Sequence, residues 1–156
     1  LSPKGVACYV DYAHTPDALE QVLMSLKNQT ERKVYVVFGC GGERDKGKRS
    51  QMGKVAESLA DSIIITDDNP RNESANKIRS DILAGCPDAI QIANRDEAIE
   101  FAINQLQDSD SLLIAGKGHE NLQLIGSETL PFNDAVVARN SVIRLRETIL
   151  KSEAKK

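Results

Sequence analysis

The most informative ten residues of this 156-residue chain are Ser62-Ile63-Ile64-Ile65-Thr66-Asp67-Asp68-Asn69-Pro70-Arg71. The first half is an apolar run rich in β-branched residues, which is typical of a strand that is covered on both faces of a parallel sheet. A helical pattern begins at about Ser74, so the polar second half fills a strand-to-helix loop. In open α/β folds these loops lie at the carboxyl ends of the strands, where ligands bind.

This loop carries an acid, an amide and a guanidinium group within four residues. Asp68 can attract an ammonium group, Asn69 can both donate and accept hydrogen bonds, and the planar fork of Arg71 suits a carboxylate. Together they indicate a receptor for a molecule with both signs of charge, such as an amino acid. The alternative is an Asx turn stiffened by Pro70, with Arg71 in solvent.

Apolar runs and helical periodicity alternate along the rest of the chain. Strands are predicted at residues 6–11, 33–38, 62–66, 89–92 and 111–115. Helices are predicted at residues 15–28, 50–60, 74–84 and 96–107. In the first helix Thr15 supplies an N-cap and Pro16 the first helical position. This alternation with short loops predicts an α/β fold with a Rossmann-like, doubly wound and mostly parallel sheet.

The pattern changes near the C-terminus. Residues 122–130 predict a hairpin around Gly126-Ser127. Asn133 or Asp134 then caps a final helix that runs to about Leu150. Residues 151–156 then form a charged tail that is expected to fray.

Composition and length favour one compact domain at residues 1–150. The chain is 40% hydrophobic and 28% charged with a formal charge of −3, so it has no basic field for nucleic acid or for a membrane surface. No apolar run approaches the roughly 20 residues of a spanning helix. The start at Leu1 is a polar lead-in rather than a signal peptide, and it suggests a piece of a longer protein.

The three cysteines, Cys8, Cys40 and Cys86, lie far apart, with no C-x-x-C pair and no histidine at a zinc-binding spacing. This predicts a reduced, cytosolic chain with no disulfide and no metal site. Cys40 sits in a glycine-rich loop and can be reactive there. The simpler interpretation is a small residue tolerated in a tight turn.

The glycine-rich loop at residues 39–49 nearly matches a phosphate-binding P-loop. Four residues separate Gly42 from Gly47-Lys48, but Arg49 stands where serine or threonine would supply a hydroxyl to magnesium. The dinucleotide pattern also fails, because no third glycine follows at the required distance. The loop is either a solvated basic turn or a source of cations for phosphate or carboxylate, namely Arg44, Lys46, Lys48 and Arg49.

Two further loops are predicted at the same edge of the sheet. Residues 116–120 read Gly-Lys-Gly-His-Glu, and the glycines allow a ligand to approach the backbone closely. Glu120 can bind an ammonium group and His119 can orient it, although a local hydrogen-bonding role is the alternative for the histidine. Tyr12 and His14 can flank a flat ring such as adenine, or serve in capping and packing.

Four motifs together resemble the C-terminal domain of the Mur ligases, which are ATP-dependent amide ligases of peptidoglycan synthesis. They are Asp-Tyr-Ala-His-Thr-Pro at 11–16, the glycine-rich loop at 39–49, Asp-Asn-Pro-Arg at 68–71 and Gly-Lys-Gly-His-Glu at 116–120. The resemblance covers about residues 6–145. In this family an Asp-Asn-Pro-Arg loop goes with the members that add meso-diaminopimelate to UDP-N-acetylmuramoyl-L-alanyl-D-glutamate, and lysine-adding relatives differ there.

The resemblance implies a role for each of twelve residues. Those holding meso-diaminopimelate would be Arg44, Asp68, Asn69, Arg71, Gly116 and Glu120. Those bordering the nucleotide would be Asp11, Tyr12, His14 and Pro16. Lys117 and His119 would support the reaction centre. Arg71 would pair with the carboxylate that lysine lacks, and polar discrimination of this kind can reach ~10⁴-fold.

The resemblance also implies that ATP and Mg²⁺ convert the glutamate carboxylate into an acyl-phosphate in the full-length enzyme, in the bacterial cytoplasm. The family's central ATPase domain and its N-terminal UDP-binding domain have no counterpart in this chain. The chain is therefore expected to bind no cofactor stably, to hold no catalytic residue by itself and to be inactive alone. The alternatives are a lysine-adding or folylpolyglutamate ligase of the same fold, or a free-standing, non-catalytic binding module.

Overall fold

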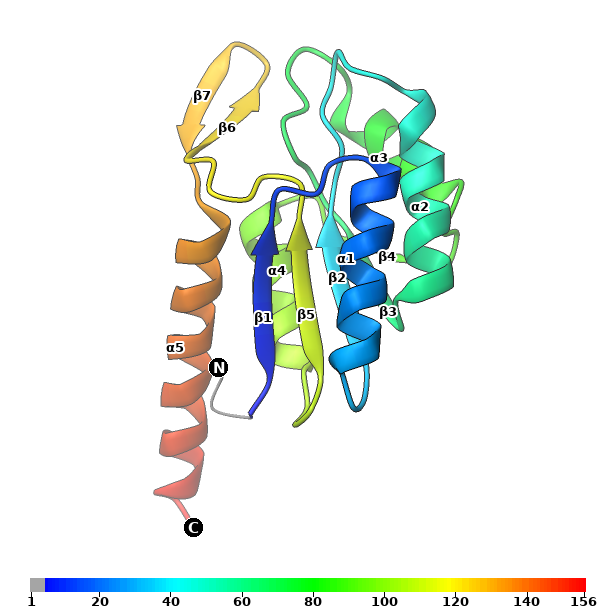
Figure 1. Cartoon of the computed structure of the whole chain (residues 1–156). Helices are drawn as coiled ribbons and strands as arrows, with labels where there is room; N and C mark the ends of the chain where they lie inside the picture. Colours follow the sequence, from blue (N-terminus) through cyan, green and yellow to red (C-terminus); the bar gives the residue numbers. More distant parts are fainter. Residues whose placement is uncertain (1–4) are drawn as a thin grey trace.

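A five-stranded parallel sheet forms the centre of the molecule (Figure 1). The strands are β1 (Ala7–Asp11), β2 (Val34–Phe38), β3 (Ser62–Ile65), β4 (Ile90–Gln91) and β5 (Ser111–Ala115), in the spatial order β1-β5-β2-β3-β4. The structure is a computed structural model and describes residues 5–156, so the predicted polar lead-in at residues 1–5 lies, except for Gly5, outside the described residues. The carboxyl ends of the strands share one edge, as parallel pairing requires.

Helices cover both faces of this sheet, which confirms the doubly wound α/β fold. The helices are α1 (Pro16–Gln29), α2 (Gly47–Leu59), α3 (Ala75–Leu83), α4 (Arg95–Gln105) and α5 (Asp134–Glu153). Apolar residues of α1, α2 and α3 pack on one face, and those of α4 and α5 on the other. The sheet separates these two hydrophobic cores. Successive side chains of a strand point to opposite faces, so Val36 and Phe38 of β2 belong to the first core and Val37 belongs to the second.

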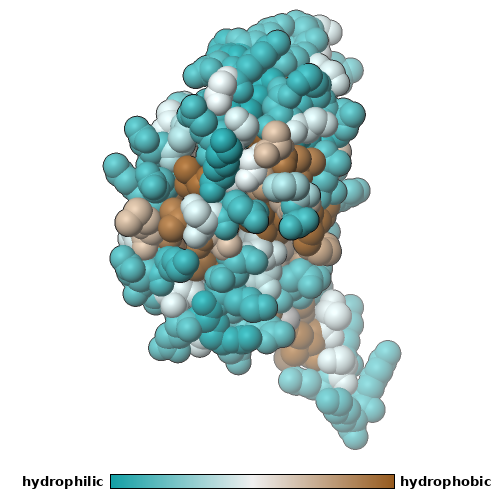
Figure 2. Space-filling model, turned by 90° about the vertical axis from the view of Figure 1, so that its right-hand side faces the viewer, coloured by the Kyte–Doolittle hydropathy of each residue, from teal (hydrophilic) through white to brown (hydrophobic). Residues whose placement is uncertain are grey.

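The surface is mostly polar. The view in Figure 2 shows a mostly hydrophilic face, with hydrophobic side chains gathered across its middle and a smaller hydrophobic group on the protruding lower part. Within residues 5–156, no helix has both the length and the apolar character needed to cross a bilayer.

Side-chain caps begin four of the five helices at the positions that their sequences favour. Thr15, Ser74, Asn94 and Asn133 each accept a hydrogen bond from a backbone N–H three residues ahead. Each cap satisfies one of the donors that a helix start leaves unpaired. For α5 the cap is therefore Asn133 rather than Asp134.

Two predicted helix boundaries were wrong. Helix α2 begins at Gly47, three residues before the predicted start, because Asp45 Oδ1 accepts from the Gly47 N–H at 2.8 Å and so initiates the turn. Helix α5 continues to Glu153, so the first half of the predicted frayed tail is helical. Residues 147–153 contain no glycine or proline that would stop the helix.

A separate two-stranded sheet lies beside the carboxyl edge of the main sheet (Figure 1). Its strands β6 (Leu122–Ile125) and β7 (Glu128–Pro131) pair antiparallel, which confirms the predicted hairpin. Gly126 has a φ of 59°, a left-handed conformation that a tight hairpin turn requires.

Candidate functional site

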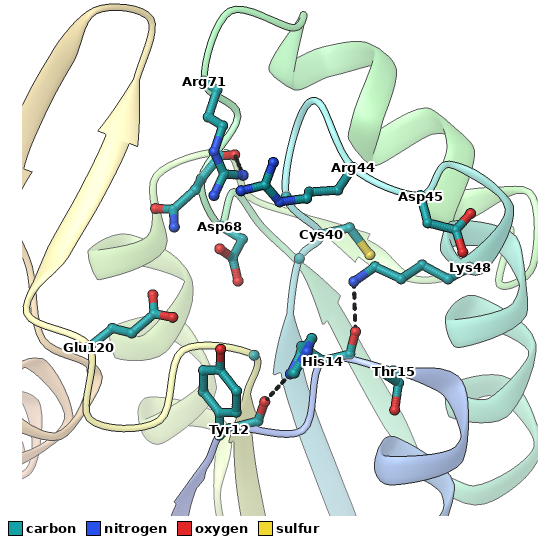
Figure 3. Close-up of a pocket in the computed structure, with 14 residues that line it drawn as sticks. Tyr12, His14, Thr15, Cys40, Arg44, Asp45, Lys48, Asp68, Arg71 and Glu120 are labelled. Atoms are coloured by element: carbon teal, nitrogen blue, oxygen red, sulfur yellow. Dashed lines mark hydrogen bonds between the residues drawn. The ribbon is translucent and has the colours of Figure 1, made fainter.

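Four loops enclose a cavity of about 440 Å³ at the carboxyl edge of the sheet (Figure 3). Each loop follows a different strand, which agrees with the convergence predicted from the sequence. The residues that line the cavity are Tyr12, His14, Thr15, Gly39, Cys40, Gly41, Arg44, Asp45, Lys48, Asp68, Asn69, Arg71, Gly116 and Glu120.

The structure brings together eight of the twelve predicted site residues. The six assigned to the amino acid all line the cavity, and so do Tyr12 and His14. Asp11, Pro16, Lys117 and His119 do not line it. Asp11 Oδ1 instead accepts from the Ala13 N–H at 2.8 Å, and Pro16 begins α1.

Opposite charges face each other across this cavity. In Figure 3 the guanidinium groups of Arg44 and Arg71 enter it from the loops after β2 and β3, the carboxylate of Asp68 lies just below them, and the carboxylate of Glu120 lies farther across, toward Tyr12. A small ligand with one carboxylate and one ammonium group can satisfy both sides at once. The cavity therefore has the charge pattern of an amino-acid receptor.

The backbone of Arg71 is held in an unusual conformation that fixes its side chain. Its φ is 52°, which is uncommon for a residue with a Cβ atom. The Arg71 N–H donates to the carbonyl of Leu124 at 3.0 Å, and the Arg71 carbonyl accepts from the Gly126 N–H at 2.6 Å. Its Nη1 donates to the Gly42 carbonyl at 2.9 Å. The hairpin and the glycine-rich loop thus hold Arg71 in place before any ligand arrives.

The side-chain oxygen of Asn69 already accepts two hydrogen bonds from within the protein. Oδ1 accepts from the Leu124 N–H at 2.9 Å and from Lys117 Nζ at 2.9 Å. An amide oxygen has two lone pairs, and both are used here. Asn69 thus accepts hydrogen bonds from the protein itself, and its NH₂ group remains free to donate to a carboxylate of a ligand.

Lys117 and His119 lie in different environments, although both were predicted near the reaction centre. Lys117 is fully buried behind the cavity wall, and its Nζ lies 3.4 Å from Glu120 Oε2 and 3.8 Å from Asp68 Oδ1. His119 is exposed. The turn at Gly118, with a φ of 56°, directs the two side chains apart.

The glycines of the 39–42 loop make room for another loop rather than for phosphate. A Cβ atom on Gly39 would lie 2.2 Å from the Thr66 carbonyl oxygen, and one on Gly42 would lie 1.9 Å from the Pro70 carbonyl oxygen. The Gly42 N–H also donates to the Asn69 carbonyl at 2.8 Å. Gly39 and Gly42 are thus needed for the close packing of the two loops, and the Gly42 N–H is used within the protein, while Gly39 and Gly41 still line the cavity.

Arg49 is not available to a ligand, so its predicted membership of a basic binding loop was wrong. The residue is fully buried, and its guanidinium donates to Glu73 at 2.8 and 2.9 Å and to Asp81 at 3.0 Å. The hydrogen bond from Arg49 is the main reason that the pKa of Glu73 falls to about 2. Lys48 remains at the cavity, where its Nζ donates to the His14 carbonyl at 2.8 Å.

Gly116 lets the Asp68 carboxylate lie against the end of β5. Its φ of 114° is a backbone conformation that residues with a Cβ atom rarely adopt. A Cβ atom there would lie only 2.8 Å from Asp68 Oδ2. Gly116 therefore contributes to the shape of the cavity by having no side chain, which leaves room for the Asp68 carboxylate.

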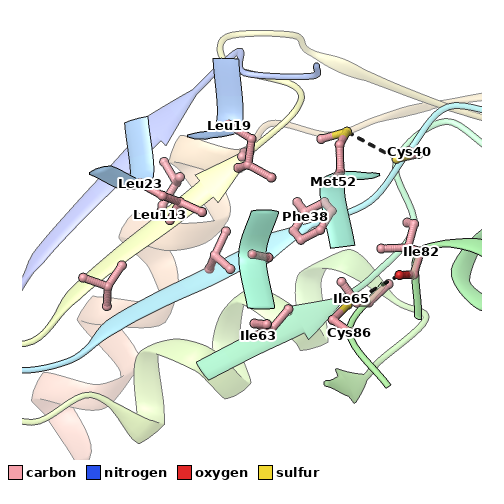
Figure 4. Packing of buried hydrophobic residues seen from close by; sticks show 14 of the residues in the cluster. Leu19, Leu23, Phe38, Cys40, Met52, Ile63, Ile65, Ile82, Cys86 and Leu113 are labelled. Atoms are coloured by element: carbon pink, nitrogen blue, oxygen red, sulfur yellow. Dashed lines mark hydrogen bonds between the residues drawn. The ribbon is translucent and has the colours of Figure 1, made fainter. Parts of the chain in front are cut away.

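Cys40 lines the cavity but is poorly suited to react. It is 3% exposed and lies beside Met52 of the core (Figure 4), with the two sulfur atoms 3.7 Å apart. Burial raises the pKa of its thiol to about 12, so the nucleophilic thiolate is scarce at neutral pH. All three cysteines are free. In the described part of the chain, no group of three or more His, Cys, Asp or Glu residues is placed to hold a metal ion.

A buried ion pair that the sequence did not reveal supports the floor of the site. Arg95 Nε and Nη2 each lie 2.7 Å from the Asp134 carboxylate, and neither side chain is exposed. Arg95 Nη2 also donates to the Ala115 carbonyl at 3.1 Å. The starts of α4 and α5 and the end of β5 are thereby joined, because a buried charge requires its partners to stay in position.

The chain resembles several bacterial ligases. It is 59% identical over 138 residues to the UDP-N-acetylmuramoyl-L-alanyl-D-glutamate--2,6-diaminopimelate ligase of Rickettsia montanensis, a match that covers 86% of this chain and 29% of the relative. The ligase of the same name from Agrobacterium fabrum is 52% identical over 141 residues, which is 90% of this chain and 29% of that protein. The chain thus spans under a third of the length of these relatives.

Solved structures agree with these matches. A structure of a UDP-N-acetylmuramoyl-L-alanyl-D-glutamate--2,6-diaminopimelate ligase has a TM-score of 0.89 and 41% identity, over 94% of this chain and 31% of that one. A folylpolyglutamate synthase/dihydrofolate synthase from Yersinia pestis has a TM-score of 0.57 at 19% identity, over 70% of this chain and 25% of that one, and it shows only a shared fold. The family described as "Mur ligase, glutamate ligase domain" matches residues 1–118. Because this match covers most of the chain, the chain belongs to that Mur ligase family.

Proposed function

We propose that this chain is the amino-acid-binding C-terminal domain of an ATP-dependent ligase that adds meso-diaminopimelate to UDP-N-acetylmuramoyl-L-alanyl-D-glutamate. The single observation that carries the proposal is the cavity in which Arg44 and Arg71 face Asp68 and Glu120. The name shared by the most similar relatives supports it. In this proposal residues 1–150 form one domain, the remaining domains precede it, and the reaction takes place in the bacterial cytoplasm.

The charge pattern suits one of the two amino-acid centres of diaminopimelate. Arg71, Arg44 and the NH₂ group of Asn69 are donors for its carboxylate, and Asp68 and Glu120 are acceptors for its ammonium group. The other amino group then points out of the cavity, toward the activated glutamate. Lysine lacks the carboxylate at this centre and would leave Arg71 without a partner, which disfavours lysine.

ATP and Mg²⁺ belong to the other domains in this proposal. The 39–49 loop does not have the complete P-loop pattern, and its Gly42 N–H already donates to the Asn69 carbonyl, which supports a phosphate site elsewhere. Tyr12 and His14 are exposed at the cavity mouth with their ring centroids 4.6 Å apart, and they can border a nucleotide that another domain holds. When bound, ATP supplies the phosphoryl group that activates the acceptor carboxylate, while this chain positions the amine.

Replacing Arg71 with alanine in the full-length ligase tests this function. We expect Arg71→Ala to lower kcat/KM for diaminopimelate by about 10²- to 10⁴-fold, because the carboxylate loses a bidentate partner. The KM for ATP should not change. Steady-state kinetics with each substrate varied in turn would measure both. Arg146→Ala, which removes an exposed arginine of α5, is the matched control and should behave as the wild type. Equal losses for ATP and diaminopimelate would contradict the assignment.

The alternatives differ in their preferred amine. The wild-type ligase offered glutamate, lysine and diaminopimelate in parallel should use diaminopimelate by a wide margin. A preference for lysine would overturn the role given to Asp68 and Arg71, and a preference for glutamate would favour the folylpolyglutamate class. A coding sequence that begins at residue 1, with no ATPase domain encoded before it, would favour a free-standing binding module.

A further inference from the structure

We propose that Lys117 is a positioning residue that shapes the amino-acid site from behind the cavity wall. It is the buried cation shared by Asp68, Asn69 and Glu120. This inference rests on the proposed function, and it assigns Lys117 to the binding of the amine substrate rather than to the reaction centre.

The contacts of Lys117 all lead to residues that line the cavity. Its side chain has no exposed surface. Its Nζ donates to Asn69 Oδ1 at 2.9 Å and lies 3.4 Å from Glu120 Oε2 and 3.8 Å from Asp68 Oδ1. The contacts with Asn69 and Glu120 are hydrogen bonds, and Asp68 lies within ion-pair distance. Lys117 thus joins the loop after β3 to the loop after β5.

Charge compensation explains why a cation is needed at this place. Asp68 and Glu120 form the acidic side of the cavity, and two carboxylates on one site repel each other. A buried cation behind them offsets this repulsion while their remaining lone pairs still face the cavity. A ligand ammonium group can then bind in front of the carboxylates that Lys117 holds from behind.

The same residue sets the orientation of the Asn69 amide. Both Lys117 Nζ and the Leu124 N–H require an acceptor, so the amide oxygen must face them. The amide NH₂ group is therefore on the opposite side, toward the cavity. Through this bond Lys117 also acts on the carboxylate-binding half of the site.

A role as proton acceptor does not fit this geometry. Lys117 is absent from the cavity lining, and Asp68, Asn69 and Glu120 separate it from any ligand there. A general base must reach the proton that it removes, directly or through one water. Lys117 instead acts through the groups that it holds.

A comparison of two substrates distinguishes a positioning role of Lys117 from a general loss of structure. The full-length ligase carrying Lys117→Met is assayed with meso-diaminopimelate and with L-2-aminopimelate, which keeps the reacting amino-acid centre and the distal carboxylate but lacks the distal amino group. We expect the KM for diaminopimelate to rise about 10- to 100-fold, the range for lost hydrogen bonds to charged groups. The KM for ATP should stay within about twofold of the wild-type value, and the preference for diaminopimelate over 2-aminopimelate should shrink.

Two further variants complete the test. Lys54→Met removes an exposed lysine of α2 and should match the wild type. Lys117→Arg keeps a cation and should retain more of the preference for diaminopimelate than Lys117→Met; it also serves as the test variant if Lys117→Met does not fold. For Lys117→Arg in that case, the expected result is a KM increase for diaminopimelate that exceeds the increase for 2-aminopimelate.

Several results would overturn the inference. Equal losses with diaminopimelate and 2-aminopimelate would indicate a structural role only, and unchanged kinetics would indicate no role. A fall in kcat at an unchanged KM would indicate that Lys117 acts at the reaction centre and not in binding the amine substrate. If the wild-type ligase itself does not use diaminopimelate, the proposed function fails first, so the two failures can be told apart.

Discussion

At the scale of single residues, small side chains determine where the charged groups of the site can lie. A Cβ atom on Gly41 would lie 2.9 Å from Arg71 Nη1, and one on Gly116 would lie 2.8 Å from Asp68 Oδ2. The two glycines thus leave space for a cation and an anion on opposite sides of one cavity. Their role here is to allow the close approach of side chains.

Gly116→Ala tests this role. We expect a stability loss of about 1 kcal/mol or more, because alanine is strained at a φ of 114°, and a higher KM for diaminopimelate because the Asp68 carboxylate must move. Thermal unfolding and steady-state kinetics of the full-length ligase measure the two effects. Gly5→Ala is the control: Gly5 also has a positive φ of 67°, but a Cβ atom there meets nothing within 4 Å. An unchanged KM in Gly116→Ala would show that Asp68 has no role in binding.

At the scale of elements, buried ion pairs join the helices to the loops of the site. Arg49 of α2 binds both Asp81 of α3 and Glu73 in the loop that precedes α3. Arg95 of α4 binds Asp134 at the start of α5. Arg95 and Asp134 are both fully buried, so removing one of these two partners would cost several kcal/mol, since the other charge would be left uncompensated. These pairs fix the relative positions of the helices around the cavity.

The Arg49–Glu73 pair predicts a pH dependence of stability. The pKa of Glu73 is lowered from 4.5 to about 2 in the folded chain, mainly by the hydrogen bond from Arg49. Its contribution is therefore present above about pH 4.5 and is lost as the pH falls toward 2. We expect Glu73→Gln to lower the Tm at pH 7, with a difference from the wild type that shrinks below pH 4.5. Thermal unfolding followed by circular dichroism from pH 7 to pH 3 measures this, and a constant difference at every pH would exclude the ion pair as its cause.

At the scale of the whole molecule, the site lies at the carboxyl edge of the parallel sheet. The cavity contains donors and acceptors for one amino-acid centre. Closure by neighbouring domains would exclude water and complete the site. The relatives, which are more than three times as long, have the additional chain that such closure needs.

The isolated 156-residue chain should therefore bind diaminopimelate weakly. We expect a dissociation constant of about 1 mM or weaker, because the open cavity leaves the charged groups of the ligand in contact with water. Isothermal titration calorimetry of the chain with diaminopimelate measures this directly. Micromolar affinity would contradict the prediction and would mean that one domain is sufficient for recognition.

The sequence by itself determined the α/β class, the helix caps and the meeting of four loops at one edge. These features follow from local properties, namely hydrophobic periodicity, the capping preferences of Thr15 and Asn133, and the rule that parallel strands end on the same side. The boundaries of α2 and α5 were missed, because they depend on an Asx turn at Asp45 and on the absence of a stop signal after Leu150.

Only the tertiary structure decided which polar side chains face the cavity. Arg49 and Lys117 have the same residue types as Arg44 and Lys48, which line the cavity, yet both are buried. Their directions depend on partners far away in the sequence, as for Lys117 and Asn69, which are 48 residues apart. A buried charge lies where its counter-charges are, and only the folded chain brings those counter-charges together.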